Sequence, residues 1–192
     1  QWIGQYKDYS ELIIQVDSIL DDLSFGREAE KFEKALDSVG KMLGFKCQRP
    51  DKMIRKGPDN LWCIENNKYI MFECKSEVKD DRKEISKYEA GQFNSHCGWF
   101  EEEYNDAEVT RYLIIPTKEL SYQGNFTHDV TIIRKNRLKT FKSNIKRFVK
   151  EFKDYNLREL NDKTIQEWID INKLDIESLK TIYSEPYYTR KS

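Results

Sequence analysis

Apolar residues in the first 43 positions recur at helical intervals and predict two amphipathic helices. The first helix is expected over residues 10–23, and the sequence leaves open whether it flanks the core or is a linker. The second is expected over residues 27–43 and ends at Gly44, a residue type that favours helix termination. The predicted buried stripe of this second helix consists of Phe32, Leu36, Val39 and Leu43.

Shorter apolar runs after Gly44 predict β-strands. Three of them are expected over residues 45–49, 60–64 and 69–74. The polar segment Glu65-Asn66-Asn67-Lys68 separates the last two and suits a hairpin turn. This arrangement predicts antiparallel pairing.

The middle of the chain continues with a helix and two more strands. The helix is expected over residues 85–104, and the buried strands over 109–115 and 130–133. The order helix, three strands, helix, strand, strand predicts an α/β (α+β) fold, with a mixed central sheet flanked by helices.

The last part of the chain predicts a helical C-terminal extension. Residues 134–150 contain eight Lys or Arg and no acidic residue, and their apolar side chains recur at helical spacing. A further helix is expected over residues 163–183. We therefore expect an N-terminal helix or linker (1–24), a core domain (25–135) and the helical extension (136–192).

The basic helix of this extension has two interpretations. It is a natural surface for nucleic-acid phosphates, or it is a solvated helix whose lysines neutralise nearby glutamates. Under the first interpretation, the nucleic-acid-binding residues are Lys139, Lys142, Lys146, Arg147 and Lys150.

The composition is that of a globular chain with a heavily charged surface, at 38% hydrophobic and 35% charged residues. Its 33 Lys and Arg nearly cancel its 34 Asp and Glu. The total charge therefore neither identifies nor excludes a nucleic-acid binder, because an acidic centre and a basic face would also sum to about zero.

The cysteines and the apolar runs bear on where the protein works. The four cysteines show no CxxC spacing, which indicates reduced thiols in an intracellular protein. No apolar run reaches the roughly 18 residues of a membrane span. A cytoplasmic location is expected. The chain starts at Gln1 without Met, which we interpret as the start of a fragment from a longer polypeptide.

The residues with the most specific chemistry lie around the predicted hairpin. Asp59 starts one strand, and Glu73 lies near the end of its partner, so their carboxylates can meet at one edge of a sheet, as a Mg²⁺ site requires. Lys75 follows two positions after Glu73 and therefore emerges on the same face. An ammonium beside two carboxylates and a metal makes phosphodiester hydrolysis plausible.

A bare acidic-x-Lys triplet carries little information in so charged a chain, since Glu77-Val78-Lys79 and Glu151-Phe152-Lys153 match it equally well. Glu73-Cys74-Lys75 differs because it ends an apolar strand that follows a turn and a Pro-Asp strand. The alternative is that Glu73 and Lys75 form an edge-strand ion pair and that Asp59 belongs to a turn. The ordered context favours the site.

Pro58-Asp59 and Glu73-Cys74-Lys75, within this order of elements, resemble the PD-(D/E)xK, or restriction-endonuclease-like, nuclease superfamily. The resemblance covers residues 26–133. Gly-Pro-Asp-Asn-Leu-Trp and the Gly-Gln helix are similar, more specifically, to nuclease domains attached to bacterial DEAD/DEAH-type helicases in phage defence or restriction. The resemblance to the superfamily implies a Mg²⁺-dependent nuclease in which Mn²⁺ can replace Mg²⁺. It implies DNA as the substrate and does not exclude RNA.

The resemblance also implies roles for further residues. Asp59 and Glu73 would bind the metal, with the Cys74 carbonyl as an extra ligand and Lys75 positioning the water. An acidic residue from the first core helix matches Glu33, with Glu30 as the second choice, and Gln92 would assist on the next helix. The family's Tyr four positions after Gln92 is replaced by His96, which we expect to be a surface histidine.

Two alternatives belong to other functional classes. The chain could be a catalytically silent nucleic-acid-binding or docking module that keeps the nuclease fold, although intact Asp59, Glu73 and Lys75 argue against this. It could also be a structural accessory domain whose C-terminal helices bind a partner. The rest of a longer polypeptide, such as a helicase or ATPase domain, is an expected partner, and the sequence leaves a homodimer open.

Overall fold

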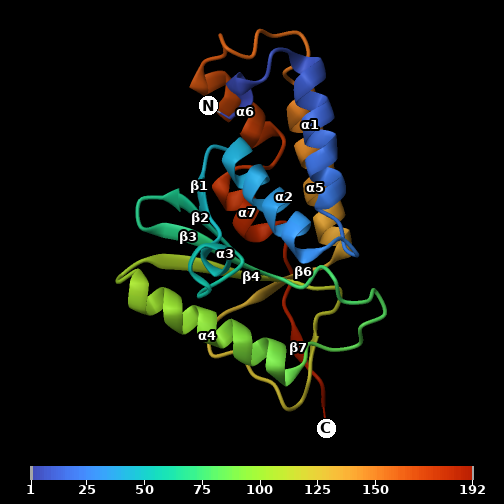
Figure 1. The fold of residues 1–192 in the computed structure, drawn as a ribbon, viewed down its shortest axis with the longest axis vertical. Coiled ribbons are helices and arrows are strands. Elements are labelled where there is room, and N and C mark those ends of the chain that lie inside the picture. Colours follow the sequence, from blue (N-terminus) through green and yellow to red (C-terminus); the bar gives the residue numbers. More distant parts are fainter. Residues whose placement is uncertain (1, 192) are drawn as a thin grey trace.

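A five-stranded mixed sheet forms the centre of the molecule in this computed structural model, which describes residues 2–191 (Figure 1). The strand order is β1-β2-β3-β4-β6. This confirms the predicted α/β class with a mixed sheet flanked by helices. The strands are β1 (Lys46–Gln48), β2 (Asn60–Glu65), β3 (Lys68–Cys74), β4 (Glu108–Ile114) and β6 (Thr131–Ile133).

The sheet is antiparallel on one side of β3 and parallel on the other. The pairing of β2 with β3 confirms the predicted hairpin, and Asn67 takes the left-handed backbone conformation (φ 61°) that the tight turn needs. Helix α4 (Lys87–Glu103) then crosses the sheet and returns the chain to β4, which pairs with β3 in parallel. The end of β3 therefore lies inside the sheet.

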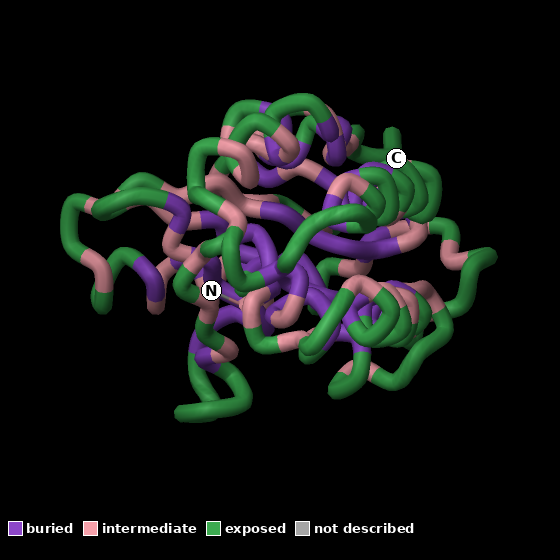
Figure 2. Tube along the Cα trace, turned by 90° about the horizontal axis from the view of Figure 1, so that it is seen from above, coloured by how far each residue is buried: buried purple, intermediate pink, exposed green. Residues whose placement is uncertain are grey.

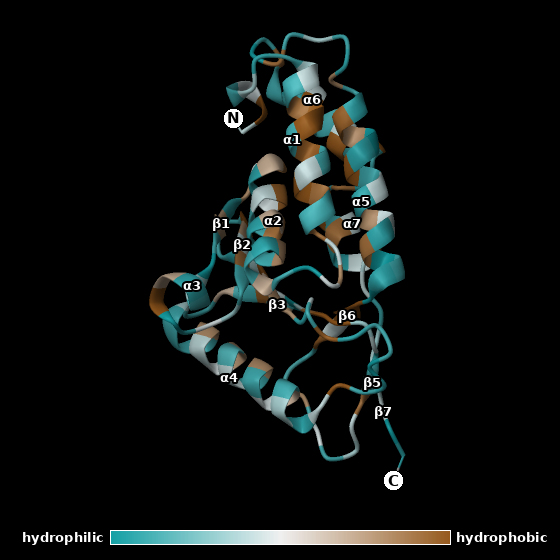
Figure 3. Ribbon diagram, turned by 45° about the vertical axis from the view of Figure 1, so that its right-hand side comes forward, coloured by the Kyte–Doolittle hydropathy of each residue, from teal (hydrophilic) through white to brown (hydrophobic). Residues whose placement is uncertain are grey.

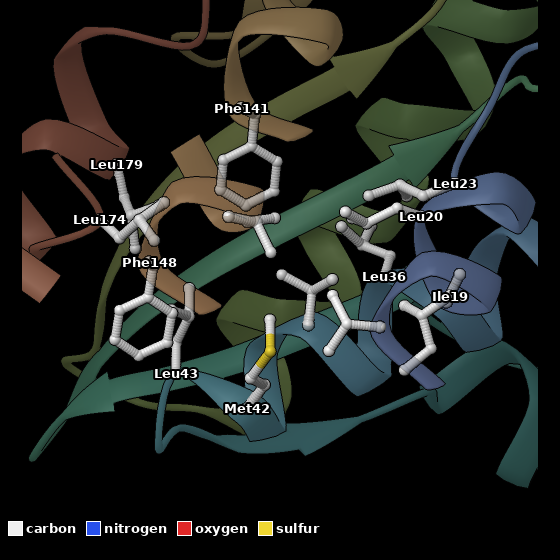
Figure 4. Packing of buried hydrophobic residues seen from close by; sticks show 14 of the residues in the cluster. Ile19, Leu20, Leu23, Leu36, Met42, Leu43, Phe141, Phe148, Leu174 and Leu179 are labelled. Atoms are coloured by element: carbon white, nitrogen blue, oxygen red, sulfur yellow. The ribbon is translucent and has the colours of Figure 1, made fainter. Parts of the chain in front are cut away.

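Helices cover both faces of the sheet and bury two apolar clusters. One face is covered by α2 (Ala29–Met42), α1 (Tyr9–Asp22), α5 (Lys135–Lys150) and α7 (Ile176–Thr181), and the other by α4 (Figures 1 and 2). Side chains from the helices interdigitate above the strands in the larger cluster (Figure 4). They include Leu20, Leu23, Leu36, Met42, Phe141, Phe148 and Leu179.

The larger cluster contains residues from all three expected segments of the chain. Leu20 comes from residues 1–24, Leu36 from residues 25–135 and Phe148 from residues 136–192. Helix α1 therefore flanks the core, which settles the choice that the sequence left open between a core flank and a linker. Helix α5 matches the expected basic helix, and its apolar stripe is buried.

Several elements differ from the expectation. The prediction of a single helix over residues 163–183 was wrong. The chain instead forms α6 (Asp162–Ile171) and α7, because Lys173 adopts φ 58° between them and the Asp175 side chain caps the start of α7. The sequence did not predict the 3₁₀ turn η1 (Ile3–Gln5), the short helix α3 (Pro50–Ile54), or the pairing of β5 (Glu119–Leu120) with β7 (Tyr188–Thr189).

The structure also bears on the cysteines and on membrane insertion. All four thiols are free of disulfide bonds, as expected. Within residues 2–191, none of the helices combines the length and the apolar character that crossing a bilayer requires.

Candidate functional site

The hairpin brings the two predicted carboxylates together. Asn60 pairs with Phe72, so the same antiparallel register places Asp59 opposite Glu73. Asp59 Oδ2 accepts a hydrogen bond of 2.6 Å from the Cys74 N–H. Asp59 is only 9% exposed and Glu73 is fully buried. The structure thus brings these two acidic groups together at the end of β3.

Lys75 and Gln92 join this pair. Lys75 Nζ lies 3.0 Å from Glu73 Oε1 and donates to Gln92 Oε1 at 2.9 Å. Burial lowers the pKa of Lys75, but the charge and hydrogen bond of Glu73, together with the charges of Asp59 and Glu89, outweigh burial, and the net pKa is raised. The ammonium therefore stays protonated at neutral pH. The structure thus brings Lys75 and Gln92 together with Glu73.

His96 is a site residue that the sequence analysis treated as a surface histidine, and that expectation was wrong. It is half-buried, and its Nδ1 lies 2.7 Å from Glu73 Oε2. It stands four positions after Gln92 on α4, so both side chains lie on the face of the helix that meets the sheet. That spacing is the signal in the sequence that could have identified it.

The start of α4 is fixed by side chains, which helps to position Gln92 and His96. Ser86 and Glu89 form a reciprocal capping box at its N-terminus. Glu89 also accepts two hydrogen bonds of 2.9 Å from Arg82, in the loop after β3. The helix is thereby tied to the segment that follows Lys75.

The charges of the two carboxylates are set by different surroundings. Burial raises the pKa of Glu73, but hydrogen bonds from His96 and Lys75 outweigh burial, so the net pKa is lowered and the group is a carboxylate. Burial, with the charges of Glu73 and Glu33 acting in the same direction, raises the pKa of Asp59 to about 8. A bound cation would relieve that repulsion.

Glu33 reaches the site from α2 but is held by an arginine. Arg49 donates to Glu33 Oε2 at 2.5 Å and forms two further hydrogen bonds, of 3.1 and 3.2 Å, with Glu30. The Asn60 side chain anchors α2 beside β2 through a 3.1 Å hydrogen bond to the Glu33 carbonyl. Burial raises the pKa of Glu33 although Arg49 opposes the shift. Glu33, and not Glu30, faces the same cavity as Asp59.

An open cavity of about 610 Å³ adjoins these groups. Both acidic and basic side chains line it, so it can receive a cation and an anion together. The lining includes Glu33, Asp59, Lys75, Ser76, Lys79 and Arg82.

The donor set fits a hard divalent cation with few protein ligands. Among residues 2–191 there is no group of three or more His, Cys, Asp or Glu side chains arranged to hold a metal. Asp59 Oδ1 has no hydrogen-bond partner among the described residues, whereas both oxygens of Glu73 already have one. Asp59 and Glu73 could hold Mg²⁺ if phosphate and water completed its coordination, which is the usual manner of binding this ion.

Three of the five predicted nucleic-acid-binding residues line one cavity. Lys139, Lys142 and Lys146 line a single groove beside α1. Arg147 instead donates to Asn144 at 2.6 Å, and neither it nor Lys150 lines that groove. Only the first three residues therefore act together.

The position of β3 bears on the alternative interpretation of the acidic-x-Lys triplet. It lies between β2 and β4, so the pair formed by Glu73 and Lys75 is not on an edge strand. A fully buried carboxylate is costly to desolvate even with two cationic or donor partners, and such groups are uncommon outside functional sites.

Comparison of the chain with family models, curated proteins and solved structures gives no match.

Proposed function

We propose that this chain is a Mg²⁺-dependent nuclease that hydrolyses phosphodiester bonds of DNA. Asp59 and Lys75 line the open cavity of about 610 Å³, which we call the catalytic cavity. The observation that supports the proposal most directly is that the buried Glu73 lies beside this lining, with its carboxylate 3.0 Å from the Lys75 ammonium. Two carboxylates and one ammonium beside an open cavity suit metal-assisted attack of water on a phosphodiester.

Each residue has a distinct part in this proposal. Asp59 and Glu73 would hold the cation, which would supply Lewis acidity when bound. Lys75 remains protonated, so it orients the attacking water and offsets negative charge on the phosphate. Gln92 holds the Lys75 ammonium in place through its 2.9 Å hydrogen bond. Glu33 adds negative charge at the cavity wall.

The resemblance of Pro58-Asp59 and Glu73-Cys74-Lys75 to the PD-(D/E)xK superfamily supports the same activity. The observed order of helices and strands is compatible with it. DNA is proposed as the substrate on the ground of that resemblance alone, as are Mn²⁺ as a substitute ion and a place in a helicase-associated defence protein.

The test is cleavage of plasmid and linear DNA by the purified chain, with Mg²⁺, with Mn²⁺ and with EDTA. We expect cleavage that needs the divalent ion. Glu73→Gln and Lys75→Met should each lower the rate by roughly 10²-fold or more, which is a typical effect of removing one electrostatic group from an active site.

The same hairpin offers matched controls. Glu65 and Lys68 also form a Glu–Lys ion pair, at 2.8 Å, but both side chains are exposed beside the turn. Glu65→Gln and Lys68→Met should leave cleavage unchanged. Equal cleavage by wild type and Glu73→Gln, or cleavage that persists in EDTA, would contradict the proposal.

A further inference from the structure

A second cavity, of about 430 Å³, lies between the loop that follows α1 and the side of α5. The two helices run side by side (Figures 1 and 3). We call this cavity the lysine groove. Its polar lining consists of Ser24, Lys135, Lys139, Lys142, Ser143 and Lys146.

The positive charge of the lysine groove is only partly compensated within the chain. Lys146 pairs with Asp17 at 3.0 Å, and Lys135 pairs with Asp80 at 2.7 Å. Within residues 2–191, Lys139 and Lys142 have no carboxylate within ion-pair distance. The groove therefore keeps at least two unneutralised ammonium groups.

Lys142 is the most constrained of these groups. It is half-buried, and its Nζ donates to Ser24 Oγ at 2.6 Å. Burial lowers its pKa, and the positive charges of Lys146 and Arg27 lower it further, whereas Asp21 opposes the shift. An anion in the groove would offset both the burial and the repulsion.

The chemistry of the groove suits a phosphate. Ammonium groups and hydroxyl groups both donate to phosphate oxygens, and lysine binds phosphate as a point charge without demanding one geometry. The floor is apolar, with Leu23, Phe25 and Leu138, so it can also lie against the carbon atoms of a sugar. A phosphodiester backbone has both features.

The groove adjoins the catalytic cavity through the loop of residues 24–27. Ser24 lines the groove, and Ser76 lines the catalytic cavity. The Gly26 N–H donates to the Ser76 carbonyl at 2.8 Å, and Ser76 Oγ donates to the Arg27 carbonyl at 3.2 Å. The exposed Arg27 stands on this loop, and among residues 2–191 its guanidinium donates a hydrogen bond only to the Asp21 carbonyl, at 3.2 Å.

We propose that the lysine groove binds the phosphodiester backbone of a nucleic-acid strand that extends over Arg27 into the catalytic cavity. The direction of the strand rests on the proposed nuclease function. The binding of the backbone by Lys139, Lys142 and Lys146 does not, since it follows from the uncompensated charge of the groove.

The experiment measures binding separately from cleavage. Fluorescence anisotropy follows labelled single-stranded and duplex DNA, and the matching RNA, in EDTA between about 50 and 200 mM salt. The combined variant Lys139→Gln, Lys142→Gln and Lys146→Gln should bind at least tenfold more weakly at the lower salt. Its salt slope should fall by roughly two to three, because each phosphate contact contributes about 0.7 to 0.9.

A charge-matched variant controls for the loss of three positive charges. The combined variant Lys46→Gln, Lys153→Gln and Lys163→Gln changes exposed lysines that do not line the groove, and it should bind within about twofold of wild type. Lys142→Arg should keep most of the binding because it keeps the charge. Equal thermal unfolding of all variants verifies the fold, and the exposed Lys139→Gln alone should still weaken binding if the triple variant unfolds.

The outcomes separate the two proposals. Undiminished binding by the groove variant, or equal weakening by both triple variants, would overturn the lysine groove as a binding site. Competition by millimolar inorganic phosphate as strong as by DNA would also overturn it, because it would identify a site for free phosphate. Groove-dependent binding without any cleavage would instead refute the nuclease and leave the groove in place.

Discussion

At the scale of single residues, Glu73 depends on donors from two elements. Lys75 follows it two positions later, directly after the end of β3, whereas His96 reaches it from α4 at 2.7 Å. We expect His96→Leu to lower the free energy of unfolding by roughly 1–3 kcal/mol, because a fully buried carboxylate would lose one of its two donors. Urea unfolding without metal measures this, and DNA cleavage should fall as well.

The chain has a second histidine that serves as the control for this variant. His128 Nε2 lies 2.8 Å from Glu101 Oε1, but the Glu101 side chain is 56% exposed. Water can replace the lost donor there, so His128→Leu should change the stability by much less. A similar loss of stability in both variants would show that burial of Glu73 has no special cost.

The residues of the candidate site could be predicted from sequence only where the contact is local. Asp59, Glu73 and Lys75 lie on one hairpin, so the strand pattern and the turn determined their meeting. His96 meets Glu73 across 23 positions, and its role depends on how α4 crosses the sheet. The hydrogen bond between Arg49 and Glu33 forms only because α2 packs against β1, and this packing could not be predicted from the apolar pattern.

At the scale of elements, α2 lies so close to the sheet that a glycine is required at the contact. A Cβ on Gly40 would lie 2.6 Å from Trp62 Cε2 and would also collide with Cys47 Sγ. We expect Gly40→Ala to destabilise the protein by about 1–3 kcal/mol, net of the gain in helix propensity. Calorimetry or urea unfolding checks this.

A glycine in α4 provides the opposite case. A Cβ on Gly98 would meet no heavy atom within 4 Å. Gly98→Ala should therefore stabilise the protein by up to about 1 kcal/mol, since only the helix propensity changes. Destabilisation by Gly98→Ala, or none by Gly40→Ala, would contradict the packing of these helices.

The predictability of the elements follows their periodicity. Helices α1, α2, α4 and α5, and the five strands of the main sheet, appeared as apolar patterns long or regular enough to recognise. The short α3 did not, because Pro50 and the αL residue Arg55 enclose only one turn. The break at Lys173 was also missed, since nothing in its apolar pattern marks a residue with positive φ.

At the scale of the whole molecule, Glu185 ties the C-terminal segment to the sheet. It exchanges two backbone hydrogen bonds with Ile132, and its carboxylate contacts Arg134 and, at 3.7 Å, Lys118. The hydrogen bond from Arg134 lowers the pKa of Glu185 against the opposing effect of burial, and Lys118 adds to the lowering. The carboxylate should therefore contribute stability to the folded state.

The sign of its pH dependence follows from that lowered pKa. The contribution is complete above the unfolded pKa, about 4.3, and is lost as the pH falls through the lower folded value. Glu185→Gln should thus be less stable than wild type at pH 7, and the difference should shrink as the pH falls below about 4. Urea unfolding across this range tests it, and a difference that grows on acidification would contradict it.

The pairing of the C-terminal segment was beyond the sequence. Strand β7 joins β5 across more than 60 positions through only two residues on each strand, Glu119 with Tyr188 and Leu120 with Thr189. Such short strands carry no recognisable alternation. The class of the fold was predictable because it depends on longer segments. The two-stranded sheet of β5 and β7 was not, because it depends on where the C-terminal segment packs against the rest of the chain.

The β2–β3 hairpin also has a consequence for how the protein acquires its native state. Loop-closure entropy favours contacts between segments that are near in sequence, so this hairpin can close more readily than β3 can find β4 beyond α4. Lys75 stays close to Glu73 during this process because it lies only two positions away, whereas His96 and Gln92 come close only when α4 packs on the sheet. The Glu73 carboxylate therefore has the Lys75 ammonium as a counter-ion from an early stage of folding.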